Sequence, residues 1–76
     1  MTIVKMKQAM SKAINNTTMT NTEIALKIGV HRHTVQRICN DYKAVSLETM
    51  VAAMIELGIE FDYIIGELRI SYHKEP

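Results

Sequence analysis

Apolar residues recur three and four positions apart in several stretches of the chain, the spacing that places them on one face of a helix. The first stretch predicts a helix over about residues 2–15, opened by Thr2 as an N-cap. Its apolar stripe consists of Met6, Ala9, Met10, Ala13 and Ile14. The polar run at residues 15–18 predicts the end of this helix.

A second, shorter helix is predicted after Thr20. Thr20 is a candidate N-cap, and Glu23, three residues on, completes a capping box. The inward positions of this helix are Ile24, Ala25 and Ile28, and the same register points Leu26 outward. Gly29 follows where a helix often ends with a residue in the left-handed conformation.

A third helix is predicted over residues 32–40, with His31 as its N-cap. Val30 returns to the core, and Val35 and Ile38 face inward. A capped short helix, a glycine turn and a second helix form the helix-turn-helix layout. Ala25 then lies where the two helices cross closely, since a larger side chain would collide there.

Residues 40–45 predict a loop, and Ser46 is the predicted cap of a fourth helix that ends at Gly58. Its stripe is Leu47, Met50, Val51, Met54 and Leu57. A short fifth helix is predicted over residues 59–65, with Phe61 and Ile64 in the core and Gly66 at its end. The alternation of Leu68, Ile70 and Tyr72 with polar residues is a strand pattern, and a lone strand needs a partner.

Composition narrows the class of protein. A chain of 76 residues with 47% apolar and 22% charged residues is typical of one soluble domain. The longest apolar run, Met50–Ile55, is far too short for a membrane span, and residues 1–14 contain no signal-peptide core. One cysteine, Cys39, excludes an internal disulfide, so we expect a cytoplasmic protein.

The net charge of +1 conceals an uneven distribution. Residues 1–45 contain seven basic and two acidic side chains, whereas residues 46–76 contain two basic and six acidic ones. This asymmetry indicates one face for a polyanion and another turned away from it.

The outward face of the predicted third helix carries the most informative chemistry. It consists of Arg32, His33, Gln36 and Arg37, long donors and acceptors with no acidic residue among them. Such side chains suit base edges in the major groove, where arginine pairs with guanine and glutamine with adenine. We therefore predict that these four residues contact bases.

Residues 20–30 followed by Thr34-Val35-Gln36-Arg37-Ile38 resemble the Cro and phage-repressor (XRE-type) helix-turn-helix family. Residues 46–50 and 57–66 resemble that family's fourth and fifth helices, so the likeness covers about residues 3–66. The resemblance implies an all-α, five-helix, lambda-repressor-like domain that binds operator DNA, usually as a dimer, to regulate transcription. The expected division is a DNA-binding domain at 1–66 and a tail at 67–76.

The resemblance also assigns contacts to individual positions. The four predicted base-contact residues fall at positions where the family contacts bases. The residues assigned to DNA phosphates are Lys12, Thr20, Asn21, His31, Thr34, Asn40 and Lys43. Three positions depart from the family pattern: Asn21 replaces a common glutamine, Cys39 a glutamate and Asp41 a glycine.

We expect dimerisation through the C-terminal end, because one helix-turn-helix contacts too few phosphates for tight specific binding. Apolar residues with no obvious partner in the same chain form the predicted interface: Tyr63, Ile65, Leu68, Ile70 and Tyr72. Their alternation would let two tails pair as an antiparallel ribbon, although a tail packed on its own monomer is the alternative.

Other functions have weaker signals in the sequence than DNA binding. His31 and His33 are two residues apart, so they would point apart if both were helical, and no metal or other cofactor is expected. Cys39 lacks a visible orienting base, and without a phosphate loop or carboxylate pair an enzyme is not expected. An antitoxin-like module that also holds a protein partner, suggested by Leu26, and a small phage activator or excision factor stay open as alternatives.

Overall fold

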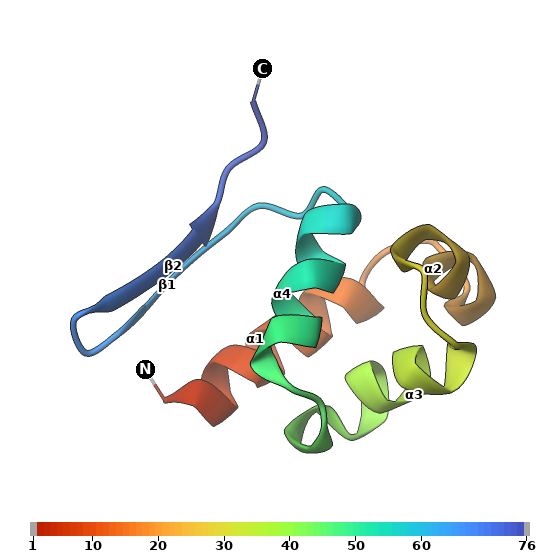
Figure 1. Ribbon diagram of the computed structural model, residues 1–76, viewed down its shortest axis with the longest axis horizontal. Coiled ribbons are helices and arrows are strands. Elements are labelled where there is room, and N and C mark those ends of the chain that lie inside the picture. The colour runs from red at the N-terminus through yellow and green to blue at the C-terminus, as the bar shows by residue number, and fades with distance from the viewer. Residues whose placement is uncertain (1, 76) are drawn as a thin grey trace.

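A computed structural model describes residues 2–75 as four α-helices, a short 3-10 turn and a two-stranded antiparallel sheet. The helices are α1 (Ile3–Asn15), α2 (Asn21–Ile28), α3 (Arg32–Asn40) and α4 (Leu47–Glu56). The 3-10 turn η1 (Tyr42–Ala44) occupies the loop between α3 and α4, and β1 (Phe61–Ile65) and β2 (Leu68–Tyr72) complete the chain. Figure 1 shows the helices clustered together and the hairpin projecting from the side opposite α2 and α3.

Each helix begins at a cap that the sequence predicts. The hydroxyl of Thr2 accepts from the Lys5 N–H at 3.2 Å, and that of Ser46 accepts from the Thr49 N–H at 3.2 Å. Thr20 and Glu23 form the predicted capping box of α2. These caps satisfy amide groups that would otherwise have no partner in the first turn.

The core forms around α1, which packs against α3, η1 and α4. The largest side chains that are fully buried are Met6, Met10, Ile14, Ile24, Val35, Ile38, Met50 and Met54. Unbranched methionines supply half of that set, and their flexible chains fill irregular space where short helices cross at differing angles. The sequence had assigned all eight to the core, and that prediction is confirmed.

The predicted fifth helix is wrong. Residues 61–65 form strand β1, so the fold is mostly helical with four α-helices rather than five. Phe61, Ile64 and Ile65 have helical spacing, yet Phe61, Tyr63 and Ile65 alternate equally well. Aromatic and β-branched residues favour strands, and a hairpin partner lies three residues on. Phe61 is in the core as predicted, whereas Ile64 is 56% exposed on the outer face of the sheet.

Strand β2 confirms the strand predicted in the tail, and its partner in this structure is β1 of the same chain. The register pairs Ile65 with Leu68 and Phe61 with Tyr72. Gly66 has φ +58°, and no other residue type among residues 2–75 has a positive φ. A two-residue loop with glycine first and positive φ only there is the pattern of a type II′ hairpin turn.

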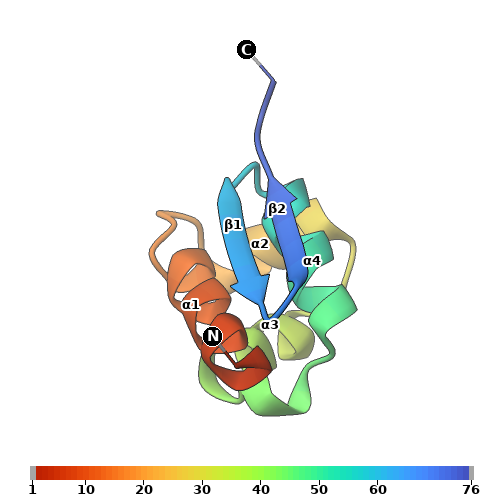
Figure 2. The ribbon, with the colours of Figure 1, turned by 90° about the vertical axis from the view of Figure 1, so that its left-hand side faces the viewer.

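The hairpin lies over the helical layer, with β1 beside α1 and β2 beside α4 (Figure 2). Its inner face packs partly buried side chains against the core: Tyr63, Ile65, Ile70 and Tyr72. The prediction that these four residues lack a partner in their own chain is therefore wrong. Leu68, the fifth residue of the predicted interface, is 57% exposed.

Candidate nucleic-acid interface

The turn between α2 and α3 is built around Ala25 and Gly29. Gly29 has φ +75°, and its N–H donates to the Ala25 carbonyl at 2.9 Å. The N–H of Val30 donates to the same carbonyl at 3.0 Å, so one oxygen closes the helix and turns the chain. Ala25 is buried, as expected where α2 and α3 pack together. This turn fixes the angle at which α3 is presented.

The exposed face of α3 is the candidate recognition surface. Arg32, His33, Gln36 and Arg37 are all exposed, and their spacing of one, three and one places them on the same side of the helix. No acidic residue lies within α3. Among residues 2–75 the only ion pair is Asp62–Arg69 in the hairpin, so Arg32 and Arg37 make no ion pair there. Their charges are available to a polyanion.

His31 caps α3 as the sequence predicts. Its Nδ1 accepts a hydrogen bond from the His33 N–H at 3.1 Å, and the two imidazole rings lie with centroids 4.5 Å apart. The rings lie close together because His31 is outside the helix rather than in it. Since Nδ1 accepts, the neutral ring carries its proton on Nε2, which becomes the side chain's only donor.

The residues assigned to phosphates lie on four neighbouring elements. Those with exposed side chains are Lys12 at the end of α1, Thr20 and Asn21 at the start of α2, His31 and Asn40 at the two ends of α3, and Lys43 in η1. Thr34 is half-buried, and its N–H donates to the His31 carbonyl at 2.9 Å. Asn21 begins α2, where the positive end of the helix dipole favours a phosphate.

Cys39, which departs from the family pattern, serves as a packed residue. The thiol is half-buried against the core, and burial raises its pKa above the usual value. A raised pKa suppresses the thiolate, the form a nucleophile or metal ligand requires. The Cys39 carbonyl accepts from the Ser11 hydroxyl at 3.3 Å, which ties the end of α3 to the buried middle of α1.

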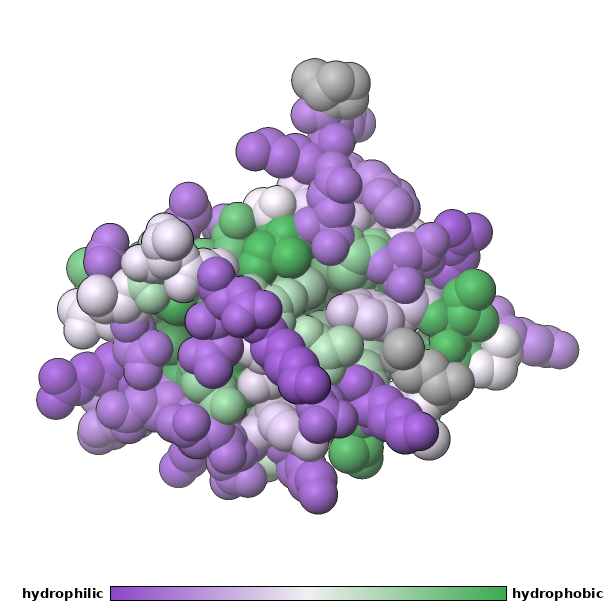
Figure 3. Space-filling view, turned by 180° about the vertical axis from the view of Figure 1, so that it is seen from behind, coloured by the Kyte–Doolittle hydropathy of each residue, from purple (hydrophilic) through white to green (hydrophobic). Residues whose placement is uncertain are grey.

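The molecule presents two different ends. Hydrophilic side chains dominate the lower left of the face in Figure 3, the side on which α2 and α3 lie. Apolar side chains gather in patches toward the hairpin end. Glu48, Glu56, Glu60, Asp62 and Glu67 all lie in α4 and the hairpin region. These five acidic side chains thus lie on elements other than α2 and α3.

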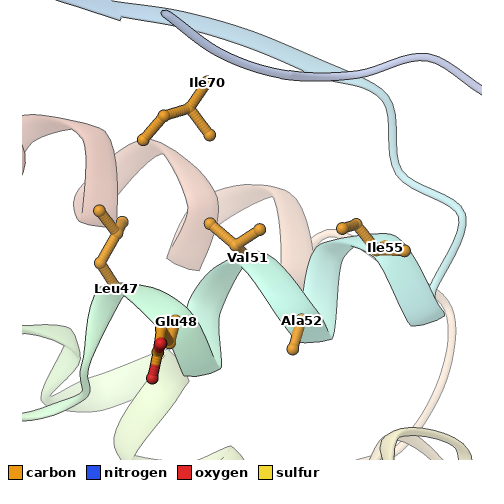
Figure 4. A pocket seen from close by; sticks show the side chains of 6 residues that line it. All are labelled: Leu47, Glu48, Val51, Ala52, Ile55 and Ile70. Carbon is orange, nitrogen blue, oxygen red and sulfur yellow. The ribbon is translucent and has the colours of Figure 1, made fainter. Parts of the chain in front are cut away.

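Sequence reasoning missed a groove between α4 and β2. It is an open hollow of about 450 Å³, lined by Leu47, Glu48, Val51, Ala52, Ile55 and Ile70. Figure 4 shows Leu47, Val51 and Ile55 along the side of α4 that faces Ile70. The available signal was the recurrence of Leu47, Val51 and Ile55 every four residues, which gives α4 a second apolar face beside the buried one.

The glycine turn that presents an exposed basic helix defines a DNA-binding protein of the helix-turn-helix class. The family described as helix-turn-helix matches residues 10–64, from the middle of α1 to β1. The chain belongs to this family, which is of the XRE type, and is a regulator that binds double-stranded DNA. No curated protein and no solved structure matches the chain. No helix within residues 2–75 is long and apolar enough to cross a membrane.

Proposed function

We propose that this protein is a small cytoplasmic repressor of the Cro type, such as phages and mobile elements encode, and that it binds a palindromic operator as a homodimer. The observation that carries the proposal is the exposed face of α3. Arg32, His33, Gln36 and Arg37 offer donors and acceptors without an acidic neighbour on the helix, which suits base edges in the major groove.

Neighbouring elements supply the sequence-independent part of the binding. Lys43, Asn21 and the Nε2–H of His31 flank α3 and would contact phosphates, which fix the register of the helix in the groove. Occupation of the operator by the dimer excludes other proteins from the same site, so this proposal includes no enzymatic step and no cofactor.

A single module contacts few phosphates, and this supports a dimer. Two copies related by a two-fold axis would place their α3 helices about 34 Å apart, one turn of DNA. The operator should then contain two half-sites of opposite orientation. The hairpin lies on the side away from α2 and α3 (Figure 1), so a dimer formed at that end would leave α3 of each copy free to bind DNA.

The test is selection of bound sites from random duplex DNA. We expect a palindromic consensus whose half-site centres are 10 to 11 base pairs apart. A consensus with a single half-site would contradict the dimer, and enrichment of no sequence would contradict specific base contacts. Repeating the selection with Arg32→Ala separates the two components, because only the base preferences should then change.

A further inference from the structure

We infer that Ser11 on α1 is a positioning residue for DNA recognition, whose hydrogen bond to the Cys39 carbonyl holds the C-terminal half of α3 where Gln36 and Arg37 contact bases. This inference rests on the proposed function, because it assigns a specificity role within the same DNA-binding surface. Ser11 is only 4% exposed, so it acts through α3 rather than on the DNA.

Ser11 is the one polar residue in the core of residues 2–75. Burying a hydroxyl without a partner is unfavourable, and a serine inside a helix can donate to the carbonyl one turn back in its own helix. The Ser11 hydroxyl instead donates to the Cys39 carbonyl at 3.3 Å, 28 positions further along the chain. The buried hydroxyl therefore joins two packed helices, α1 and α3.

The end of α3 lacks the left-handed glycine that closes α2. That glycine is Gly29, with φ +75°. α3 ends at Asp41, with φ −144°, and the Asp41 N–H donates to the Arg37 carbonyl at 2.7 Å. The Cys39 carbonyl belongs to the last turn, where carbonyl groups have no amide partner within the helix. Ser11 supplies a donor for this carbonyl from outside the helix.

The two ends of α3 are therefore held by different parts of the fold. At the N-terminal end, the His31 cap fixes Arg32 through neighbours in the chain. Gln36 and Arg37 lie less than one turn from the carbonyl that accepts from Ser11. Direct contact with base edges requires donors and acceptors held in fixed positions. Loss of the Ser11 bond should thus disturb contacts at the C-terminal half of α3 and spare those at its start.

Affinity for two duplexes tests this role. Ser11→Ala removes the donor with little change of shape. On the consensus duplex from the site selection it should lose affinity roughly threefold to tenfold, because a net hydrogen bond contributes that much. On a scrambled duplex of the same length its affinity should stay within about twofold of wild type, because phosphate contacts come from other residues. Fluorescence anisotropy measures both, at a temperature where circular dichroism shows each variant folded.

Thr17→Val is the matched control. The Thr17 hydroxyl donates to the Ile14 carbonyl at 2.9 Å, so this substitution also removes a half-buried bond between a side chain and the backbone. That bond lies at the end of α1 and does not reach α3. Thr17→Val should lower stability about as Ser11→Ala does, without changing the ratio of the two affinities. A ratio lowered equally in both variants would show that lost stability weakens binding, and would overturn the inference.

Double-mutant cycles test where along α3 the effect falls. Ser11→Ala combined with Arg37→Ala should lose less affinity for the consensus duplex than the sum of the two single losses, since both changes remove the same contact. Combined with Arg32→Ala, the losses should add, because the N-terminal end of α3 holds Arg32 independently. Coupling to Arg32 without coupling to Arg37 would overturn the inference.

Hydrogen exchange tests the inference without DNA. The Asp41 N–H closes the end of α3, so its exchange should be faster in Ser11→Ala and unchanged in Thr17→Val. Equal exchange in Ser11→Ala and wild type would overturn the inference and leave the proposed function standing. A wild type that binds both duplexes equally would overturn the proposed function, and with it the specificity role of Ser11, even where exchange is faster.

Discussion

Arg32 and Lys43 are predicted to make two different kinds of DNA contact. Arg32 is the first residue of α3, on the face predicted to enter the major groove, whereas Lys43 lies in η1 beside the helix. Base contacts give sequence preference, and phosphate contacts give affinity that falls with salt. Removing each side chain should therefore change DNA binding in a different way.

Arg32→Ala should cost about 1–3 kcal/mol of operator binding and relax preference at one or two positions of each half-site. Lys43→Ala is the matched control, and it should weaken binding to operator and random DNA alike while flattening the salt dependence. Fluorescence anisotropy on both DNAs at several salt concentrations measures this. Equal losses on operator and random DNA for Arg32→Ala would rule out its role at the bases.

His31 caps α3, and we predict that its Nε2–H also contacts a phosphate. His31→Asn keeps an acceptor for the His33 N–H but loses the Nε2–H donor, so thermal stability should hold while binding to all sequences weakens. His31→Ala should also lose about 1 kcal/mol of stability, the usual effect of removing an N-cap. Thermal melts and binding isotherms separate the two effects. Unchanged DNA affinity in His31→Asn would limit His31 to capping.

Tyr63 makes stability depend on pH in alkaline solution. Burial raises the pKa of its phenol above the ordinary value near 10, so the folded state holds this proton more tightly than the unfolded state. Its stabilising contribution is complete below the unfolded pKa and is lost as pH rises through the folded one. Urea denaturation at pH 9 and pH 11 should show a larger drop for wild type than for Tyr63→Phe. An equal drop in both would contradict this role.

The elements show which signals in a sequence are decisive. Thr20 with Glu23, His31 and Ser46 predicted helix starts correctly, because a cap is a local hydrogen bond between neighbours in the chain. The stretch at 59–65 was wrongly predicted to be a helix, because five residues fit both the helical period and the strand period. Only pairing with β2 decides between helix and strand. The spacing of polar residues was enough to predict the exposed face of α3. The groove beside α4 could not be predicted from the sequence, because it depends on where the hairpin lies and no local pattern gives that position.

Gly29 provides a test at the level of an element. A Cβ at this position would meet no atom within 4 Å, so the cost of substitution comes from φ +75° alone. Gly29→Ala should therefore destabilise by about 1–2 kcal/mol. Gly29→Asn should cost less, since asparagine tolerates the left-handed region. Chemical denaturation of both variants measures the difference, and an alanine variant as stable as wild type would show that the turn relaxes.

At the scale of the whole molecule, the predicted DNA contacts and the apolar groove lie on different elements. The predicted contacts lie on α1, α2, α3 and η1, while most acidic residues and the groove lie in α4 and the hairpin region. Removing residues 67–76 would not simply release a tail. It would strip β1 of its partner and uncover Phe61 and Tyr63, which contact Tyr72 or the core. Point substitutions on the surface are therefore the sound way to separate the two ends.

Dimerisation gives the prediction at this scale. The proposed homodimer should bind a palindromic operator with a steeper concentration dependence than a DNA in which one half-site is destroyed, because two copies then bind together. Gel-shift titrations with the full operator and with the single half-site compare the two. Equal steepness on both DNAs would show that dimerisation does not assist binding.

The tight turn at Gly66 has a consequence for assembly kinetics. Both strands of the hairpin come from adjacent segments of one chain, so each copy can complete its fold as a unimolecular event, at a rate independent of concentration. Two folded copies that form the proposed dimer would then exchange no segments. Differently labelled dimers should consequently exchange subunits on mixing without unfolding.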